Sequence, residues 1–152
     1  MGLNNLTIRT VKYEDLKSIY LIERLSFERP YPSSYLETLA YLSPGTFLVV
    51  SLNGCIVGYS ASVLRGSEGH VISIAIHPDY RGIGIGERLL RENIKRLKDL
   101  GAKRVILEVK VDNLQALKLY QKLGFKIVKT LKNYYWNGAD AYRMSLNVDH
   151  ST

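Results

Sequence analysis

The stretch Ser73–Leu90 reads SIAIHPDYRGIGIGERLL, and the rest of the chain can be interpreted around it. An apolar run typical of a strand stops at a proline, a glycine-rich turn follows, and a helix begins. Gly82, Gly84 and Gly86 have no side chain to pack, so their use is to let a ligand approach the main chain. The N-terminus of the next helix supplies unpaired N–H groups and a positive dipole end, and Arg81 adds a cation. The stretch therefore predicts a phosphate or pyrophosphate site.

Two common phosphate-binding loops do not fit this stretch. A Walker loop needs a lysine followed by serine or threonine, whereas Glu87 follows Gly86 here. The Rossmann fingerprint is Gly-x-Gly-x-x-Gly, whereas these glycines stand at every second position. Taken alone, the stretch is also compatible with a surface turn that binds no ligand.

Length and composition predict one globular domain, residues 1–152, with a loose tail at 149–152. The chain has 152 residues, of which 46% are hydrophobic, enough for one core. The single cysteine, Cys55, excludes an internal disulfide, fits a reducing interior and is expected to be a small core residue. No apolar run approaches the roughly 20 residues of a membrane span, and the N-terminus lacks the pattern of a secretion signal. We therefore expect a cytoplasmic protein without a membrane partner.

The chain is basic, with 21 Lys and Arg against 14 Asp and Glu, a net charge of +7. This charge fits a nucleic acid, a polyanionic cofactor or docking on a ribosome. The basic residues are scattered, without a run of five, so nucleic acid is not expected as a substrate.

Hydrophobic periodicity and turn signals predict the element order β-α-α-β-β-β-α-β-α-β-β. Ser34 and Glu37 are expected to form a capping box for the second helix, and Asn53-Gly54 to form a hairpin turn. The strand–helix–strand unit from 70 to 109 requires a parallel crossover, whereas the hairpins are antiparallel. The fold class is therefore α/β, or α+β, with a mixed sheet and helices on both faces. The expected strands are 6–11, 46–52, 55–64, 70–76, 103–110, 125–131 and 141–148, and the helices run from 14 to 28, 34 to 42, 85 to 100 and 113 to 123.

The pattern Arg81-x-x-Gly84-x-Gly86 after a strand resembles the pyrophosphate-binding motif of the GNAT acyltransferases. The second half of the chain is also similar to that superfamily, in Leu107-Glu108-Val109, Asn113, Ala116, Leu119-Tyr120 and Leu123-Gly124-Phe125. The resemblance implies a GNAT-like fold with a central mixed sheet of about seven strands. It also implies acetyl-CoA as the co-substrate and no metal.

Within the superfamily, the chain most resembles the RimI and NatA-type protein N-terminal acetyltransferases. The features that carry this are residues 69–75 (GHVISIA), 132–135 (KNYY) and 140–142 (DAY). The resemblance implies that the acceptor is the N-terminal α-amine of a ribosomal protein or nascent chain, and it leaves docking on a ribosome or an auxiliary subunit open. The residues that it implies for the cofactor are Ile74, Ala75, Ile76, Arg81, Gly82, Ile83, Gly84, Ile85, Gly86, Glu87, Asn113 and Tyr120.

Acetyl transfer to an amine needs a base, an oxyanion donor and an acid for the leaving thiolate. By the resemblance, Glu108 is the base, acting through water, and Tyr120 is the acid; the backbone N–H of Ile76 is the candidate oxyanion donor. From position alone, Glu108 also fits a solvent-facing strand residue paired with a lysine, and Tyr120 fits a core tyrosine.

Three residues are candidates for binding the acceptor. Tyr31 stands between two prolines on a stiff loop, and Tyr134 lies in the last hairpin connection; both could line a slot for a peptide. His70 begins the central strand and could orient the amine, although a surface histidine is the simpler interpretation. His77 precedes a proline and is expected to shape the turn.

The pKa of the acceptor amine favours a protein N-terminus. An α-amino group has a pKa of about 8 and a lysine of about 10.4, so deprotonating lysine at pH 7 costs roughly 3 kcal/mol more. A modest base is therefore enough for an N-terminus. The alternatives are a GNAT enzyme acting on lysine or a small amine, and a non-catalytic module that binds acyl-CoA or nucleic acid.

Overall fold

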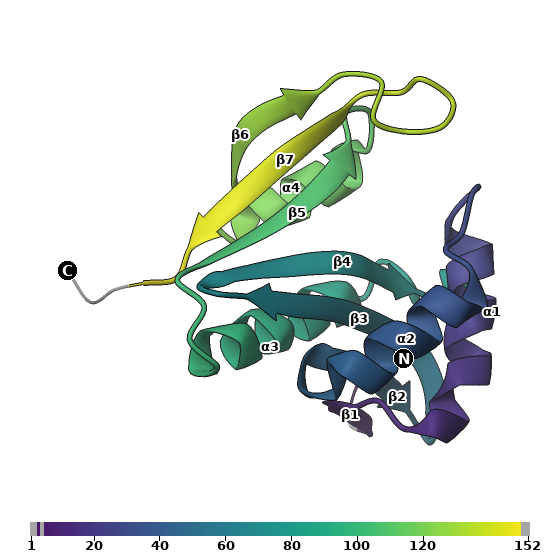
Figure 1. Ribbon diagram of the computed structural model, residues 1–152. Coiled ribbons are helices and arrows are strands. Elements are labelled where there is room, and N and C mark those ends of the chain that lie inside the picture. Colours follow the sequence, from purple (N-terminus) through teal and green to yellow (C-terminus); the bar gives the residue numbers. More distant parts are fainter. Residues whose placement is uncertain (1–2, 4, 150–152) are drawn as a thin grey trace. The chain divides into compact units, whose positions relative to one another are not determined.

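The structure, a computed structural model, describes residues 3 and 5–149, and its element order is the one that the sequence predicts (Figure 1). In the described part of the chain, short 3₁₀ turns accompany the helices and strands at Tyr13–Asp15, Pro44–Thr46 and Pro78–Tyr80. The strands are β1 (Leu6–Thr10), β2 (Phe47–Leu52), β3 (Cys55–Arg65), β4 (Glu68–Ile76), β5 (Arg104–Lys110), β6 (Lys126–Leu131) and β7 (Ala141–Asn147), and the helices are α1 (Leu16–Ser26), α2 (Ser33–Leu42), α3 (Ile85–Asp99) and α4 (Leu114–Lys122).

Hydrogen bonds join the strands in the order β1-β2-β3-β4-β5-β7-β6. The pairs β1–β2, β2–β3, β5–β7 and β6–β7 are antiparallel. Strand β4 pairs with β5 in parallel, with Glu68–His70 opposite Arg104–Ile106. The predicted seven-stranded mixed sheet and the parallel crossover are therefore confirmed.

Internal contacts divide the chain into two compact units. Unit 1 comprises residues 1–63 and 71–96, and unit 2 comprises residues 64–70 and 97–152. Strand β4 contributes to both, because its first three residues belong to unit 2 and the rest to unit 1. The expectation of a single domain over the whole chain stays a prediction.

The core of unit 1 lies on both faces of its strands, because alternate side chains of a strand point to opposite faces. Phe47 and Val49 of β2 pack in a cluster with residues of α1 and α2. Leu48 and Val50, which alternate with them, pack in a second cluster with Ile85 and Leu89 of α3. In unit 1, helices therefore cover both faces of the sheet (Figure 1).

Unit 2 is built on β5, β6, β7 and α4. Strand β5 is buried over most of its length, with Val105, Leu107 and Val109 at 5% exposure or less. Helix α4 contributes the buried side chains of Leu117 and Tyr120. Within residues 3 and 5–149, no helix has the length and apolar character needed to cross a membrane.

Two local predictions were wrong. Helix α2 begins at Ser33 after Pro32, and no side chain caps it; the Pro32 carbonyl instead accepts hydrogen bonds from the N–H groups of Tyr35 and Leu36. Pro32 takes the N-cap position with its preset φ of −57°, so Ser34 lies inside the first turn and cannot be the cap of the expected capping box. Cys55 is exposed rather than part of the core, because it is the first residue after the hairpin turn.

The hairpin turn itself is confirmed, with positive φ at Asn53 and Gly54, as a type I′ turn requires.

Near the C-terminus, where a loose tail was expected from residue 149, the Asp149 N–H is bound to the carbonyl of Lys103 and to Asn147 Oδ1. The remainder of the expected loose tail, 150–152, lies outside the described residues.

Among the described glycines of unit 1, Gly58 of β3 has the least room for a side chain. A Cβ at this position would lie 2.5 Å from Ile76 Cδ1, 2.9 Å from Val50 Cγ1 and 3.0 Å from the Ala75 carbonyl oxygen. We expect Gly58→Ala to lower the free energy of unfolding by about 1–3 kcal/mol, because the strands must separate to admit the methyl group.

Urea unfolding monitored by circular dichroism checks this prediction. Gly45→Ala is the matched control, because its added Cβ meets no atom within 4 Å, and we expect it to change the unfolding free energy by less than about 0.5 kcal/mol. Equal losses in the two variants would contradict the packing argument.

Candidate active site

The glycine-rich loop follows the end of β4 and leads into α3, as the sequence predicts. Gly82 and Gly84 have φ of +80° and +89°, a backbone conformation that other residues rarely adopt. A Cβ on either glycine would meet no atom within 4 Å. The loop therefore presents exposed backbone at the N-terminus of α3, where N–H groups and the helix dipole favour an anion. This geometry fits a pyrophosphate.

Arg81 stabilises the glycine-rich loop through hydrogen bonds and also adds a positive charge to it. Its Nε donates to the Ile76 carbonyl oxygen at 2.8 Å, and one terminal nitrogen donates to Ser26 Oγ at 3.0 Å. A guanidinium has five N–H donors, so these two bonds use only part of its capacity. Arg81 thus joins the end of β4 to the end of α1, and its contact with a phosphate stays a prediction.

His77 shapes the turn before this loop, as expected. Its Nδ1 accepts a hydrogen bond from the Asp79 N–H at 3.1 Å, and the backbone N–H of His77 donates to the Val57 carbonyl at 2.8 Å. These contacts anchor the turn to β3.

In unit 2, Glu108 of β5 lies between two basic side chains. His70 Nε2 and Glu108 Oε1 are 2.7 Å apart, and Arg143 Nε donates to Glu108 Oε2 at 3.1 Å. The pairing of the strands explains the second contact, because Arg143 of β7 stands directly opposite Glu108. The Glu108 side chain is only 10% exposed, so the alternative of a solvent-facing residue paired with a lysine is wrong.

The charge state of Glu108 follows from these neighbours. Burial raises the pKa of the Glu108 carboxyl, but the hydrogen bond and charge of His70, and then those of Arg143, outweigh burial and hold this pKa below its usual range. Glu108 is therefore an ionised hydrogen-bond acceptor at neutral pH. It can orient a cation or a water molecule, and it is a weak base by itself.

Helix α4 carries the other two residues predicted in unit 2. Asn113 caps the helix, with its Oδ1 accepting a hydrogen bond from the Ala116 N–H at 3.2 Å. The Tyr120 ring packs against Phe125, with the ring centres 6.0 Å apart. Burial raises the pKa of Tyr120 to about 12, so its hydroxyl keeps its proton at neutral pH. Contact of either residue with a cofactor stays a prediction.

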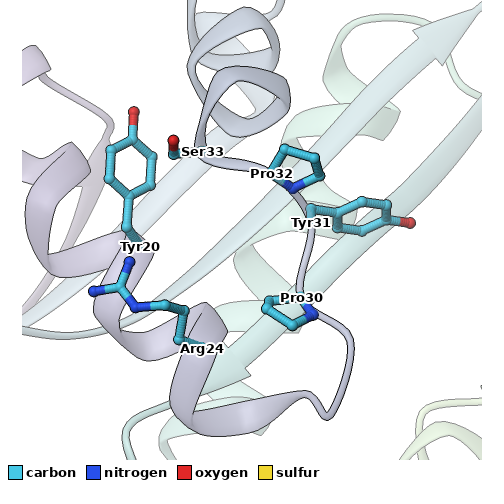
Figure 2. A pocket seen from close by; sticks show the side chains of 6 residues that line it. All are labelled: Tyr20, Arg24, Pro30, Tyr31, Pro32 and Ser33. Atoms are coloured by element: carbon cyan, nitrogen blue, oxygen red, sulfur yellow. The ribbon is translucent and has the colours of Figure 1, made fainter.

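The loop with Tyr31 borders a pocket of about 250 Å³ in unit 1. Figure 2 shows Tyr20 and Arg24 of α1 on one side of the loop, with the Tyr31 ring pointing away from them. Tyr31 is 43% exposed, so its ring is accessible. Tyr134, in unit 2, is 47% exposed and packs edge-on against Tyr135. The pocket is lined by Tyr20, Arg24, Pro30, Tyr31, Pro32 and Ser33.

Sequence reasoning missed four polar residues around these sites. Arg143 was not singled out, because its role depends on cross-strand register. In unit 1, Glu23 of α1 is 2% exposed and binds Tyr59 of β3 and Ser73 of β4. A signal for Glu23 was present, since it continues the apolar stripe of α1 formed by Leu16 and Ile19 and so places a carboxylate on the buried face.

Comparison with known proteins identifies the family. The model of the acetyltransferase (GNAT) family matches residues 16–125. The chain belongs to the GNAT acetyltransferase family. It is thus an acyltransferase, and the resemblance drawn from the glycine loop and from the second half of the sequence is confirmed.

Relatives and solved structures match this GNAT family member over nearly its whole length. A Sulfurisphaera tokodaii protein named N-alpha-acetyltransferase is 36% identical over 151 residues, which cover 91% of this chain and 90% of the relative. The structure of Ard1 from Thermoplasma volcanium matches with a TM-score of 0.91 and 29% identity, over 95% of this chain and 99% of the other. The ribosomal-protein-S18-alanine N-acetyltransferase of Escherichia coli matches with a TM-score of 0.87 and 27% identity, over 97% and 96%. These proteins are of the RimI and N-terminal acetyltransferase type that the sequence resembles.

The His70–Glu108–Arg143 contacts predict a pH-dependent contribution to stability. Because the pKa of Glu108 is lowered by folding, this contribution is present above the usual carboxyl pKa of about 4.3 and is lost as the pH falls through the lower folded value. We expect Glu108→Gln to be less stable than the unmodified protein by about 1–3 kcal/mol at pH 7, and the difference to shrink toward pH 3.

Urea unfolding at a series of pH values measures this difference. The control is Glu28→Gln, which makes the same charge change on an exposed side chain. A difference for Glu108→Gln that stays constant from pH 7 to pH 3 would contradict the assigned charge interactions.

Proposed function

We propose that this protein transfers an acetyl group from acetyl-CoA to the N-terminal α-amine of proteins, with ribosomal proteins or nascent chains as acceptors. The observation that carries the proposal is the ionised Glu108, a side chain only 10% exposed and held by His70 and Arg143, in a chain with relatives named N-alpha-acetyltransferase. The proposal assigns no metal. Among the described residues, no group of three or more His, Cys, Asp or Glu side chains is arranged to hold a metal ion.

The cofactor would be held mainly by backbone. The backbone N–H groups of the segment from Gly82 to Glu87 would bind the pyrophosphate, with Arg81 beside them. In β4, the backbone of Ile74–Ile76 would receive the pantetheine and thioester, and the Ile76 N–H would stabilise the oxyanion. Asn113 and Tyr120 would add contacts from α4. When bound, acetyl-CoA supplies the acetyl group already activated as a thioester.

Glu108 would act on the acceptor amine through water. Its pKa lies below the usual carboxyl range, so direct capture of a proton from an α-ammonium group, with a pKa of about 8, is uphill by several pKa units. The carboxylate is therefore best used to orient the amine and the water that carries its proton to solvent. His70, which is hydrogen-bonded to the Glu108 carboxylate, would help Glu108 to orient the amine.

This arrangement favours an α-amine over a lysine. About a tenth of α-amino groups are neutral at pH 7, whereas fewer than one lysine in a thousand is, given pKa values of about 8 and 10.4. A weak base that relies on water cannot make up that difference. The charge state of Glu108 thus supports a protein N-terminus as the acceptor.

Tyr120 would protonate the leaving thiolate. Its pKa of about 12 keeps the hydroxyl protonated, so it can donate a hydrogen bond as charge develops on sulfur. A thiol has a pKa of about 8.5, and complete transfer from Tyr120 would therefore be uphill by about 5 kcal/mol unless solvent returns the proton. We therefore assign Tyr120 the role of hydrogen-bond donor that passes a proton on from solvent.

A peptide panel tests the proposed function. The purified protein is incubated with acetyl-CoA and peptides that vary in residues one and two, each also supplied with a blocked N-terminus, and products are followed by free thiol and mass spectrometry. We expect acetylation only of free N-termini. We also expect Glu108→Gln to lower kcat by about 10²–10⁴-fold while acetyl-CoA affinity stays near normal.

The other outcomes of the panel are equally informative. Acetylation of blocked peptides at lysine would replace the N-terminal acceptor with a side-chain amine. An unchanged kcat in Glu108→Gln would remove the assignment of Glu108 while leaving the acceptor class standing.

Gly84→Val tests the cofactor loop. A valine at a φ of +89° strains the backbone, and its side chain would occupy the open space that the pyrophosphate needs. We expect the Kd for CoA, measured by calorimetry, to rise by about tenfold or more. The control Gly54→Val carries the same strain, at a φ of +84° in the hairpin turn, and should leave CoA affinity unchanged. Native affinity in Gly84→Val would show that the pyrophosphate binds elsewhere.

A further inference from the structure

The carboxylate of Glu23 is buried in unit 1 and has no part in the acetyl transfer proposed above. Its Oε1 accepts hydrogen bonds from the Tyr59 hydroxyl and, at 3.1 Å, from Ser73 Oγ. Its Oε2 accepts a hydrogen bond from the Tyr31 backbone N–H at 2.9 Å. Burial, and then the charge of Glu23, raise the pKa of Tyr59, so the Tyr59 hydroxyl keeps its proton and acts as a donor. A carboxylate that is 2% exposed is thus held by three neutral donors.

The bond to Tyr31 has a particular importance for the loop between α1 and α2. Pro30 and Pro32 have no backbone N–H, so Tyr31 carries the single main-chain donor of the segment Pro30–Pro32. That donor is given to Glu23. The two prolines restrict the backbone of the segment, and the hydrogen bond selects where the restricted segment lies.

The bond to Ser73 reaches the part of the unit that the proposed reaction uses. Ser73 directly precedes Ile74 in β4, and the backbone of Ile74–Ile76 is the proposed site of the thioester. One carboxylate therefore binds both the loop that carries Tyr31 and the strand that would carry the acetyl group. Tyr59 completes the link, because its hydroxyl is also 3.1 Å from Ser73 Oγ.

We propose that Glu23 is a positioning residue for the acceptor. By binding the Tyr31 N–H with one oxygen and Ser73 of β4 with the other, it sets the distance between the Tyr31 loop and Ile74–Ile76, and so determines how well a peptide N-terminus binds. The inference rests on the proposed function, because it needs a peptide acceptor at this loop. Glu23 acts through Tyr31 and is not assigned a contact with acceptor or cofactor.

A role in stability alone makes a different prediction. If Glu23 only satisfied buried donors, its loss would lower the unfolding free energy and leave the binding of peptide to the remaining folded protein unchanged. A positioning role instead raises the KM for the peptide selectively, at an unchanged affinity for acetyl-CoA. The test therefore compares KM, kcat and cofactor Kd in the same variants.

Glu23→Leu and Glu23→Gln separate the acceptor function of the side chain from its volume. Leucine fills similar space but accepts no hydrogen bond, so Tyr31 loses its acceptor. Glutamine keeps one oxygen for the Tyr31 N–H, and the hydroxyls of Tyr59 and Ser73 can turn to accept from its amide. We expect Glu23→Leu to raise the peptide KM by about tenfold or more with the acetyl-CoA Kd within about twofold, and Glu23→Gln to stay within about threefold of the unmodified protein in both.

Hydrogen exchange at the Tyr31 amide, followed by NMR, gives a readout that does not need activity. We expect exchange to accelerate by about tenfold in Glu23→Leu and to stay near normal in Glu23→Gln. Glu14→Gln, an exposed acid outside the proposed site, is the control for the charge change. An unchanged exchange rate or an unchanged KM in Glu23→Leu overturns the proposal, as does an equal rise in KM and in the acetyl-CoA Kd.

A second pair of variants applies if Glu23→Leu does not fold. Tyr31→Pro removes both the ring and the N–H, whereas Tyr31→Ala removes only the ring. A higher peptide KM in Tyr31→Pro than in Tyr31→Ala supports the proposal, and equal values overturn it. If the unmodified protein acetylates no free N-terminus, the proposed function itself fails and the acceptor role of Glu23 fails with it; the exchange measurement then still decides whether Glu23 holds the loop.

Discussion

Positive φ at Gly82 and Gly84 is the constraint on which the proposed cofactor site depends. The chain must turn from the end of β4 into α3 while keeping the first N–H groups of the helix open to a ligand. Side chains at these two positions would strain the backbone and fill the open space in front of it. Arg81 then stabilises the turn through the Ile76 carbonyl and Ser26, so that the loop is tied to α1 as well as to β4.

Glu108 and Glu23 are two carboxylates with little exposure, and the protein stabilises them in different ways. Glu108 lies against His70 and Arg143, and these charges lower its pKa. Glu23 lies among a phenol, a serine hydroxyl and a backbone N–H. The first environment yields an ionised group that can act on a cation. The second yields hydrogen bonds with defined directions, which hold segments of the chain in place.

In the proposed function, Glu108 would serve the chemistry of acetyl transfer, and the Tyr31 loop held by Glu23 would serve the choice of acceptor. A carboxylate with a lowered pKa is suited to an amine that is already partly neutral at pH 7, and this favours a protein N-terminus over lysine. The stiff loop with Tyr31 borders a pocket lined by Tyr20 and Arg24 (Figure 2). Because prolines flank Tyr31, little conformational freedom is lost when the loop meets an acceptor. Selection of the peptide would thus depend on packing in unit 1 rather than on the acid–base groups of unit 2.

Features that depend on neighbours in sequence were predictable. Hydrophobic periodicity, the Asn53-Gly54 turn and the glycine loop before α3 are local signals, and they sufficed for the order of elements, the mixed sheet and the family. Local signals failed where the sequence offered two ways to begin a helix, as when Pro32 rather than Ser34 took the N-cap position of α2. The prediction of Glu108 as the base came from the family resemblance, since its position alone favoured a surface residue.

The tertiary structure decided the partners of the buried charges. Tyr59 and Ser73 stand 36 and 50 residues after Glu23, and Arg143 stands 35 residues after Glu108. Such contacts depend on strand register and on which helix face is buried, and neither is fixed by residues close in sequence. The sequence by itself therefore determined the fold, the family and the glycine loop, because these follow from local backbone preferences. Only the folded chain determined that Glu108 is ionised between His70 and Arg143 and that Glu23 holds the Tyr31 loop, because both depend on distant donors brought to one carboxylate.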